Sequence, residues 1–342
     1  MTKKKKAYAR AGVDVDLGNR LKQDIHRLVR QTYGPEVLGT IGGFGGLFAP
    51  DFSGMREPVL VSSIDGVGTK LKIAFAMDRH DTVGADLVNH CINDIAVLGA
   101  RPLFFLDYIG AEKLEPRVFA QILRGFSRAC RAGGCALIGG ETAQMPGMYQ
   151  RGEYDLAGCI VGVVDRGLMI DGSRIRPGDI ILGLLSNGLH TNGYSLARNV
   201  FFEEMRLKPS ARIKGLSKSV GEELLRTHKN YQPLLAKVPA GKFKGLAHIT
   251  GGGLVDNLPR VLPDDCDAVI ETGSWKVPGI FQIMQEQGRV PREEMYQVFN
   301  MGIGLAAIVA PNDAGAIAKQ LRAKTIGRIA PGRGSVRLEI KA

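Results

Sequence analysis

The chain has 342 residues, of which 44% are hydrophobic and 23% charged, a balance typical of a folded globular protein and not of a disordered one. Because this length exceeds what a single hydrophobic core usually supports, we expect two domains. The formal net charge is +11, but four of these charges are Lys3 to Lys6 and aromatic residues make up only 6%, so the composition does not favour a nucleic-acid-binding protein.

The hydropathy pattern and the cysteines restrict the class of protein further. No apolar run reaches about 18 residues and no apolar stretch follows the N-terminal lysines, so neither a membrane span nor a secretory signal is expected. We therefore expect a cytoplasmic protein that binds neither nucleic acid nor membranes. A zinc site is not expected either, because the cysteines lack paired C-x-x-C spacing. The cysteines are Cys91, Cys130, Cys135, Cys159 and Cys266.

The first half of the chain mixes helices and strands without a regular β-α-β repeat. Leu17, Leu21, Ile25 and Leu28 recur at helical spacing, which predicts a helix over residues 14–30. Further helices are predicted at 82–98 and 117–132. Strands are predicted at 58–64, 103–108, 135–138 and 154–164.

The second half begins after a stretch rich in turn residues and charges, residues 165–179, which precedes a new apolar strand at 180–185. This composition predicts a domain boundary near residue 168, with domains at 1–168 and 169–342. Both halves are predicted to have an α+β architecture. The remaining predicted helices are 196–204, 222–237 and 314–324, and the remaining predicted strands are 268–271 and 304–310.

Two glycine-containing segments of the first half are candidates for phosphate binding. Residues 42–46 form a GGFGG loop, in which Gly43 and Gly45 would let a ligand approach the backbone. The second segment, 65–70, follows a predicted strand and offers the amides of Gly66 and Gly68, the hydroxyl of Thr69 and the ammonium of Lys70. It does not match a Walker A loop. A tight turn with a surface lysine is the alternative interpretation.

Acidic residues near these segments are candidates for binding a cation. Asp86, His90 and Asp94 are spaced to lie on one face of the predicted helix. Mg²⁺ prefers one or two carboxylates together with phosphate oxygens, which favours Asp94 with Asp65 over a set that contains histidine. His90 is then a polar neighbour. Glu141 follows a predicted strand within GGETAQMPGMY and either enters the site or holds a loop through backbone N–H groups.

Polar loop residues of the second half are candidates for binding a substrate. His190, in the segment 187–193, could carry a proton, although a surface histidine is the alternative. Asn192 lies beside it. The segment 250–253 (TGGG) precedes a possible helix, so the amides of Gly251 and Gly252 could bind a phosphate. A bare turn is the alternative there.

Taken together and in this order, the motifs closely resemble the family of phosphoribosylformylglycinamidine cyclo-ligases, also called aminoimidazole ribonucleotide synthetases. The resemblance covers nearly the whole chain. Asp94 to Pro102 also fits the D-x-x-x-x-G-A-x-P pattern of the wider superfamily. Gln144, where glutamate is usual, and Leu189-His190-Thr191 depart from the family pattern. The matching segments are YARAGVDVD from Tyr8, GGFGG, DGVGTK, NDIAVLGARPLFFLDY from Asn93, GGETAQMPGMY, HTNGYSL, ITGGGLVDNLPRVLP from Ile249, and MYQVFNMGIG from Met295.

The resemblance implies ATP-dependent closure of the imidazole ring of formylglycinamidine ribonucleotide in purine biosynthesis, with Mg²⁺. It also implies a homodimer in which the N-terminal domains share a β-barrel, and a C-terminal α/β sandwich. We assign Asp65, Asp94 and Glu141 to Mg²⁺, and Lys70, His190 and Asp94 to catalysis. The predicted ligand-binding residues are Gly43, Gly45, Asp65, Gly66, Gly68, Thr69, Lys70, Asp94, Glu141, Asn192, Gly251 and Gly252.

Other functions stay open on the sequence alone. A kinase or an amidotransferase of the same superfamily would act on a different acceptor. The amidotransferase is generally longer than this chain and lacks the MPGMY and HTNGYSL motifs. Selenophosphate synthetase would be expected to carry a reactive cysteine near the N-terminal glycine loop, whereas the first cysteine here is Cys91. A basic RNA-binding module is the alternative outside the enzymes, and it would bind RNA with a steep salt dependence.

Overall fold

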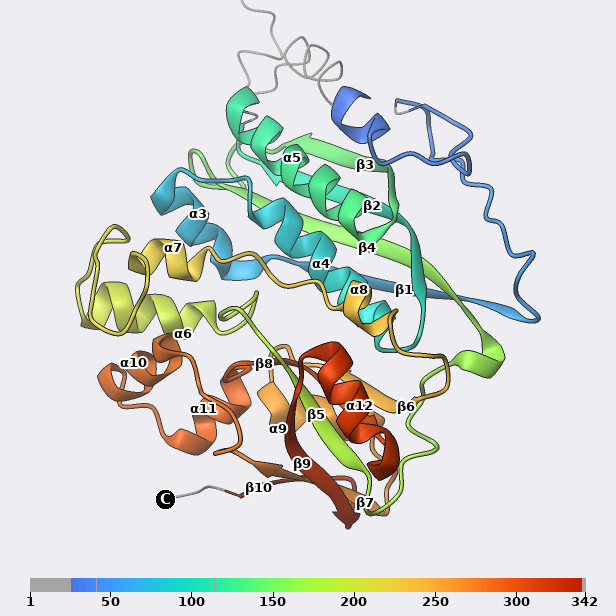
Figure 1. The fold of residues 1–342 in the computed structure, drawn as a ribbon. Helices are drawn as coiled ribbons and strands as arrows, with labels where there is room; N and C mark the ends of the chain where they lie inside the picture. Colours follow the sequence, from blue (N-terminus) through green and yellow to red (C-terminus); the bar gives the residue numbers. More distant parts are fainter. Residues whose placement is uncertain (1–25, 41, 114, 340–342) are drawn as a thin grey trace, which may run out of the picture.

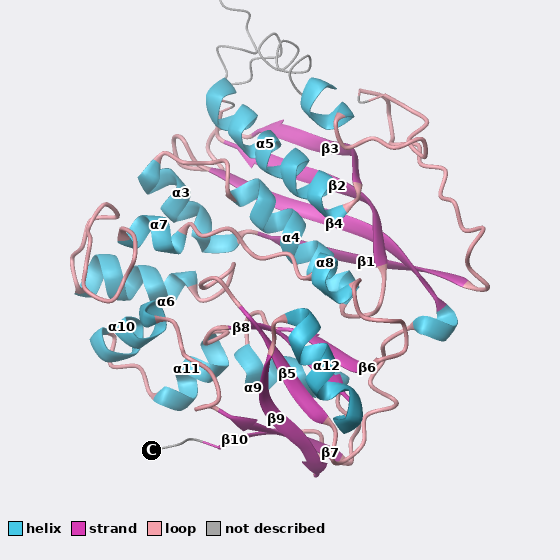
Figure 2. Cartoon of the chain, in the orientation of Figure 1, coloured by secondary structure: helices cyan, strands magenta, loops and turns pink. Residues whose placement is uncertain are grey.

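A computed structural model describes residues 26–40, 42–113 and 115–339 of the chain (Figure 1). The lysine run and most of the helix predicted at 14–30 lie outside the described residues, and 26–30 are helical. Within the described part, no helix combines the length and the apolar character that a bilayer span needs. The chain forms two sheets, one from residues 58–165 and one from residues 180–339 (Figure 2).

The first sheet has four strands in the order β1-β4-β2-β3. Strand β4 runs antiparallel to β1 and β2, whereas β2 and β3 are parallel. Helices α4 (Val83–Ala96) and α5 (Pro116–Gly133) pack side by side over one face (Figure 1). Their close approach requires glycine, because a Cβ on Gly84 would collide with the carbonyl oxygen of Ile122. The strands are β1 (Pro58–Gly66), β2 (Arg101–Ala111), β3 (Ala136–Gln144) and β4 (Tyr154–Asp165).

The opposite face of this sheet is not covered by any helix of the described residues. Alternate residues of β1 point to this face, and Leu60 and Ile64 are 63% and 73% exposed. Successive side chains of a strand point to opposite faces, so Val59, Val61 and Ser63 point toward the helices. One face of the sheet is therefore buried inside the chain, and the other presents apolar side chains to solvent.

The second sheet has six strands in the order β10-β7-β9-β5-β8-β6. Strands β10 and β7 are parallel and the other neighbours are antiparallel. All residues of β8 (Ile303–Val309) are buried, as expected for an apolar strand that is covered on both faces. The other strands are β5 (Ile180–Leu185), β6 (Phe243–His248), β7 (Cys266–Glu271), β9 (Lys324–Pro331) and β10 (Val336–Glu339).

Short helices surround this sheet and fill the space between the two halves (Figure 1). Helix α12 contacts β5, and α9 contacts α11. The 3₁₀ segments are Gly68–Lys70, Arg166–Leu168 and Leu258–Val261, and Asn199–Glu204 forms a π-helix. The remaining helices are α3 (Leu71–Met77), α6 (Tyr194–Arg198), α7 (Val220–Leu224), α8 (Gln232–Leu235), α9 (Gly253–Asn257), α10 (Gly279–Gln287), α11 (Arg292–Val298) and α12 (Pro311–Leu321).

The helix predicted at 222–237 is wrong, because only its two ends are helical, as α7 and α8. Several backbone groups between them bond to the first half of the chain. Arg226 O accepts from Lys70 Nζ at 2.7 Å, and His228 N donates to Asp86 Oδ1 at 2.6 Å. Tyr231 N donates to Asn93 Oδ1 at 2.9 Å. These bonds take backbone groups that a continuous helix would need.

Two further predictions need correction. The helix predicted at 314–324 ends at Leu321, and Lys324 begins β9. The strand predicted at 135–138 continues to Gln144, so Gly139, Gly140 and Glu141 lie within β3 and not in a loop after it. Strands β6, β9 and β10 were not predicted. The domain boundary near residue 168 stays a prediction, and it falls in the connection between β4 and β5.

Candidate functional site

Four histidines from both halves of the chain meet where the two halves face each other. His90 lies on α4 and His248 at the end of β6, whereas His190 and His228 lie in loops. All four are buried, with exposed fractions of 4%, 6%, 1% and 1%. The rings of His190 and His228 stack with centroids 4.0 Å apart. The ring centroids of His90, His228 and His248 lie 5.0–5.2 Å from one another.

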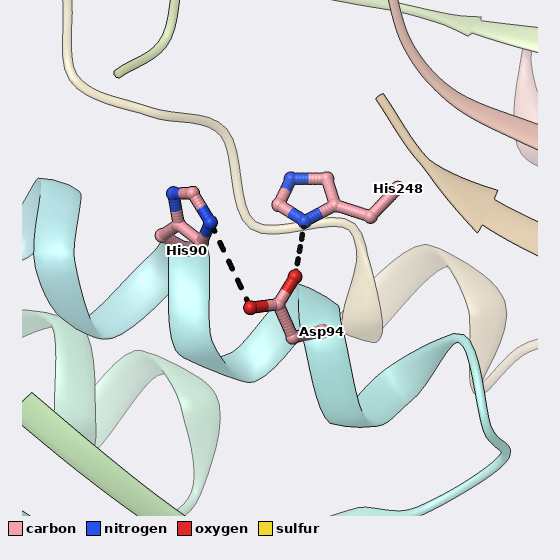
Figure 3. A group of neighbouring side chains, drawn as sticks. All are labelled: His90, Asp94 and His248. Atoms are coloured by element: carbon pink, nitrogen blue, oxygen red, sulfur yellow. Dashed lines mark hydrogen bonds and ion pairs between the residues drawn. The ribbon is translucent and has the colours of Figure 1, made fainter. Parts of the chain in front are cut away.

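A continuous series of polar contacts joins two carboxylates through these rings. Asp65 Oδ2 lies 2.7 Å from His90 Nε2, and His90 Nδ1 lies 2.8 Å from Thr191 Oγ1. Thr191 Oγ1 lies 3.2 Å from His228 Nδ1. His228 Nε2 lies 3.0 Å from His248 Nε2, and His248 Nδ1 lies 2.8 Å from Asp94 Oδ1 (Figure 3). The series closes on itself, because His90 Nε2 is 3.7 Å from Asp94 Oδ2.

The carboxylates form the accessible side of this cluster and the rings form its buried side. The side chains of Asp65 and Asp94 are 39% and 26% exposed, against 5% for His90 and 3% for His248. Ser63 Oγ donates to Asp94 Oδ2 at 3.0 Å, and Gly66 N donates to Asp65 Oδ1 at 2.6 Å. These donors leave lone pairs on both carboxylates that face outward.

Electrostatics keep both carboxylates ionised. Burial would raise the pKa of Asp65, but the hydrogen bond and the charge of His90 outweigh it, so the pKa of Asp65 is lowered. Burial likewise opposes the charged form of Asp94, but the hydrogen bond and the charge of His248 lower its pKa. The pKa of His90 is raised despite burial, because Asp65 and Asp94 stabilise its charged form. Burial lowers the pKa of His248.

His190 is buried without a hydrogen-bond partner for either ring nitrogen among the described residues. Its backbone has φ of 63°, a left-handed conformation that costs roughly 1–2 kcal/mol for a residue with a side chain. Burial, and then the charges of His248 and Lys70, hold the pKa of His190 well below its ordinary value. The ring is therefore neutral and offers one donor and one acceptor that the described protein groups leave unused.

The ammonium of Lys70, a candidate for phosphate binding and catalysis, is occupied by acceptors of the protein itself. Its ammonium is fully buried and donates to Asp86 Oδ1 at 2.9 Å, His190 O at 2.9 Å and Arg226 O at 2.7 Å. A lysine has three N–H donors, so all of them are in use. Burial lowers the pKa of Lys70 and raises the pKa of Asp86, and each charge counters this effect on the other. We therefore reassign Lys70 to holding the loops of His190 and Arg226 against α4.

The structure does not bring Glu141 together with Asp65 and Asp94. Asp65 pairs with Gly158, Gly158 with Asp107, and Asp107 with Gly140, so one row crosses the sheet. Three strand spacings of about 4.8 Å separate the ends of this row by about 14 Å. Glu141 is one residue further along and points to the opposite face, where it is exposed. One ion cannot be held by all three carboxylates of this chain.

The predicted glycine segments fall into two groups. Gly66, Gly68 and Thr69 lie beside the second half of the chain, where Thr69 Oγ1 is 3.3 Å from Ser195 Oγ. Gly251 is close to Asn192, because a Cβ on Gly251 would lie 3.2 Å from Asn192 Oδ1. Gly252 has φ of 94°, which favours glycine.

The second group lies at the other edge of the first sheet. The loop that contains Gly43 and Gly45 reaches β3, where a Cβ on Gly46 would lie 2.8 Å from Ile138 Cδ1. A Cβ on Gly45 would meet no atom of the described chain within 4 Å, so packing within the chain does not explain glycine there. This loop therefore accompanies Glu141 and not Asp65.

Sequence reasoning missed part of the cluster. His228 and His248 were not predicted, nor were Asn93 and Thr191 singled out. His248 lies two residues before Thr250 and could have been found from that position. His228 lies in a segment predicted as helix and carries no motif, so only the fold reveals it.

The chain matches two families over most of its length. These are "AIR synthase related protein, N-terminal domain", over residues 54–164, and "AIR synthase related protein, C-terminal domain", over residues 176–339. The phosphoribosylformylglycinamidine cyclo-ligase of Anaeromyxobacter sp. (strain Fw109-5) is 52% identical over 340 residues, which cover 97% of this chain and 98% of that one. The protein of the same name from Syntrophotalea carbinolica is 53% identical over 312 residues, which cover 91% and 89%.

Solved structures share the fold at lower identity. A thiamine-monophosphate kinase from Stenotrophomonas maltophilia K279a has a TM-score of 0.66 and 21% identity, with 94% of this chain and 95% of that chain covered. The hydrogenase maturation protein HypE in complex with ATP has a TM-score of 0.68 and 19% identity, with coverage of 94% and 91%. These two proteins have different names and share the fold of this chain, so the fold alone does not select the reaction.

Proposed function

Because the chain belongs to the AIR synthase related family, we propose that the cluster around Asp65 and Asp94 is where it carries out its reaction. The reaction is that of its cyclo-ligase relatives: the chain is a carbon–nitrogen ligase of purine biosynthesis that uses ATP to form aminoimidazole ribonucleotide. The observation that carries the proposal is a pair of ionised, solvent-facing carboxylates backed by buried imidazoles from both halves.

The chemistry requires that a formamide oxygen leaves, and hydroxide is a poor leaving group. Transfer of the γ-phosphoryl group of ATP to that oxygen gives an iminophosphate and ADP. The amidine nitrogen then attacks the activated carbon, loses a proton and expels phosphate. The protein contributes by holding the two reactants in line and by stabilising charge. Fixing the reacting atoms can supply roughly 7–11 kcal/mol of the barrier.

Asp65 and Asp94 fit Mg²⁺ through the carboxylate lone pairs that their protein partners leave unused. Mg²⁺ takes one or two carboxylates together with phosphate oxygens and water. When bound, the ion would neutralise charge on the triphosphate. The lowered pKa of each carboxyl group supports this assignment, because both carboxylates are ionised at neutral pH. Gly66 ends strand β1, which also carries Asp65, and Gly68 and Thr69 follow shortly after it. These three residues would bind the triphosphate.

Glu141 and the loop with Gly43 and Gly45 form a second region that could contact the nucleotide. Glu141 is exposed on the face of the sheet opposite to Asp65. It would hold a separate ion or a different part of the nucleotide, and not the ion at Asp94. This separation is a consequence of the strand register.

The substrate is proposed to bind on the side of the second half of the chain. Asn192 Nδ2 is buried without a partner among the described residues, and its side chain lies next to Gly251. The amides of Gly251 and Gly252 would bind the ribose phosphate. His190 is neutral and has an unused donor nitrogen and an unused acceptor nitrogen, so it would orient the substrate through hydrogen bonds.

Product formation tests the proposal. Purified protein with ATP, Mg²⁺ and formylglycinamidine ribonucleotide should form the aminoimidazole, detected by diazo coupling, together with ADP. Asp94→Asn should lower kcat by roughly 10²–10³-fold, the usual effect of losing one charge-stabilising group. Asp81→Asn is the matched control, since Asp81 pairs with Arg79 at the surface. Equal turnover of both variants would remove Asp94 from the site.

The uncovered face of the first sheet supports a homodimer in which this face is buried. Leu60 and Ile64 are large apolar side chains with 63% and 73% exposure. A shared barrel would remove this surface from water. Sedimentation at micromolar concentration should give the mass of a dimer for the parent chain and of a monomer for Ile64→Asp. A monomeric parent chain would contradict the proposal.

A further inference from the structure

The carboxylates are not the only metal-ligating groups at the cluster. His90, Asp94 and His248 each place a ligand atom within 4.8 Å of the others (Figure 3). His248 Nδ1 is 2.8 Å from Asp94 Oδ1, and His90 Nε2 is 3.7 Å from Asp94 Oδ2. Two imidazole nitrogens and a carboxylate therefore converge on one point from α4 and β6.

Hydrogen bonds around Asn93 assign the tautomer of His228. Asn93 Oδ1 accepts from Tyr231 N at 2.9 Å, and Asn93 Nδ2 donates to Lys229 O at 2.8 Å, which fixes the orientation of the amide. The second hydrogen on Nδ2 faces His228 Nε2 at 3.2 Å. His228 Nε2 is therefore an acceptor, and its proton lies on Nδ1, which donates to Thr191 Oγ1.

This tautomer determines which nitrogen of His248 carries the proton. His248 Nε2 lies 3.0 Å from His228 Nε2, so His248 must be the donor in that contact. A neutral His248 then has its lone pair on Nδ1, and that lone pair faces Asp94 Oδ1 at 2.8 Å. Two acceptors at this distance repel each other unless a proton or a metal ion lies between them.

The remaining contacts of the series need no cation. Thr191 can donate its hydroxyl proton to His90 Nδ1, and His90 Nε2 can donate to Asp65 Oδ2 at 2.7 Å. Thr191 can instead accept from both His90 and His228, which leaves a lone pair on His90 Nε2 for an ion; that ion would also separate this nitrogen from Asp65 Oδ2, which lies 2.7 Å away. The network can therefore present three ligand atoms to one ion, while the outer nitrogen of each ligating ring stays hydrogen-bonded to the protein, as is usual at metal sites.

We propose that His90, Asp94 and His248 form a site for a divalent first-row transition ion such as Co²⁺, Zn²⁺ or Mn²⁺. Imidazole and carboxylate ligands together favour these ions over Mg²⁺, which prefers oxygen alone. Three protein ligands leave a position open for water or for a phosphate oxygen. Asp94 is 26% exposed on the solvent side, which gives an ion access. The ion replaces a proton that Asp94 and His248 would otherwise share, so binding releases that proton.

The site is tested without ATP or substrate, so the outcome is independent of the proposed reaction. Chelator-treated full-length protein is titrated with Co²⁺ alone, and a saturable visible d–d band is expected at one ion per chain. Zn²⁺ should displace Co²⁺, whereas Mg²⁺ should bind at least about tenfold more weakly than Co²⁺ in the same competition. Co²⁺ should also raise the midpoint of thermal unfolding of the parent chain more than an equal concentration of Mg²⁺ does.

Two ligand variants and one control locate the ion. His248→Gln and His90→Gln should each lose the saturable band, and two separate variants keep the test decisive if one of them fails to fold. His80→Gln is the control, because His80 is also buried but pairs with Tyr154 and Asp78 away from the cluster. It should keep the band. The proposal is overturned if the parent chain shows no saturable band, if both ligand variants keep it, or if near-ultraviolet bands show that cysteine thiolates bind the Co²⁺.

Discussion

Replacement of Lys70 by methionine tests whether this lysine holds the two halves of the chain together or acts on the nucleotide. Methionine keeps an apolar stem of similar length but leaves Asp86 and the carbonyls of His190 and Arg226 without their donor. The Lys70 and Asp86 side chains are both fully buried. Removal of one partner from a buried ion pair costs about 3–5 kcal/mol, because the other charge stays buried without compensation.

This loss is large enough to measure. A domain of 150–250 residues loses about 2–4 °C of Tm per kcal/mol, so Lys70→Met should lower the Tm by roughly 6–20 °C in calorimetry. Lys72→Met is the control two residues along the chain. Lys72 pairs with Glu153 at 2.7 Å, but these side chains are 37% and 22% exposed. Surface pairs contribute about 0–1 kcal/mol, so this variant should unfold close to the parent chain.

A double variant distinguishes the cost of leaving Asp86 unpaired from the cost of losing the lysine side chain. Lys70→Met combined with Asp86→Leu removes both charges, and it should recover part of the lost stability because no unpaired charge remains buried. The reasoning is refuted if Lys70→Met unfolds like the parent chain and yet loses turnover. In that case the ammonium acts on the substrate, and the reassignment of Lys70 is wrong.

Two further predictions concern the second half of the chain. Folded His190 stays neutral, whereas the unfolded ring takes a proton below about pH 6.5. The free energy of unfolding should therefore fall as the pH drops below that value. His190→Phe should reduce the slope of the unfolding free energy against pH by up to about 1.4 kcal/mol per pH unit, measured by urea denaturation. An unchanged slope would contradict the neutral ring. Gly253→Ala should destabilise the chain more than Gly241→Ala: both glycines have positive φ, 57° and 80°, but only at Gly253 would a Cβ collide with Tyr296 O. Equal unfolding free energies of the two variants would show that the clash relaxes freely.

The first half of the chain was well predicted from the sequence, because its elements carry strong local patterns. Strand β1 and helices α4 and α5 lie within a few residues of their predicted positions. The failures are elements whose backbone bonds to distant residues. Residues 225–231 have apolar and polar side chains at helical spacing, yet their backbone groups bond to Lys70, Asp86 and Asn93 more than 130 positions away in the chain. A local pattern cannot detect such partners.

The candidate site was predicted in part for a related reason. Asp65 and Asp94 were identified because acidic residues near a phosphate-binding segment carry a chemical signal. Lys70 carried the same kind of signal, but the sequence does not reveal that Asp86 and two carbonyls take its donors. Glu141 was grouped with the other carboxylates because its motif does not show how the strands pair. The register of the paired strands places Glu141 about 14 Å away, on the other face of the sheet.

The same contacts explain why the site needs both halves of the chain. Asp65, His90 and Asp94 come from the first half, whereas Thr191, His228 and His248 come from the second. Burial of a polar group costs free energy unless the group is hydrogen-bonded. Each half on its own would therefore expose its part of the network to solvent or leave it buried without partners. The buried Lys70–Asp86 pair adds contacts to the loops of His190 and Arg226.

A displacement between the halves would therefore break several buried polar contacts at once. Such a network holds the carboxylates and imidazoles at fixed separations before any ligand binds. Reactions whose rate depends on positioning and on fixed charge benefit from this property, because the protein does not have to reorganise during the reaction. The position of the histidines at the junction of the two halves follows from this requirement.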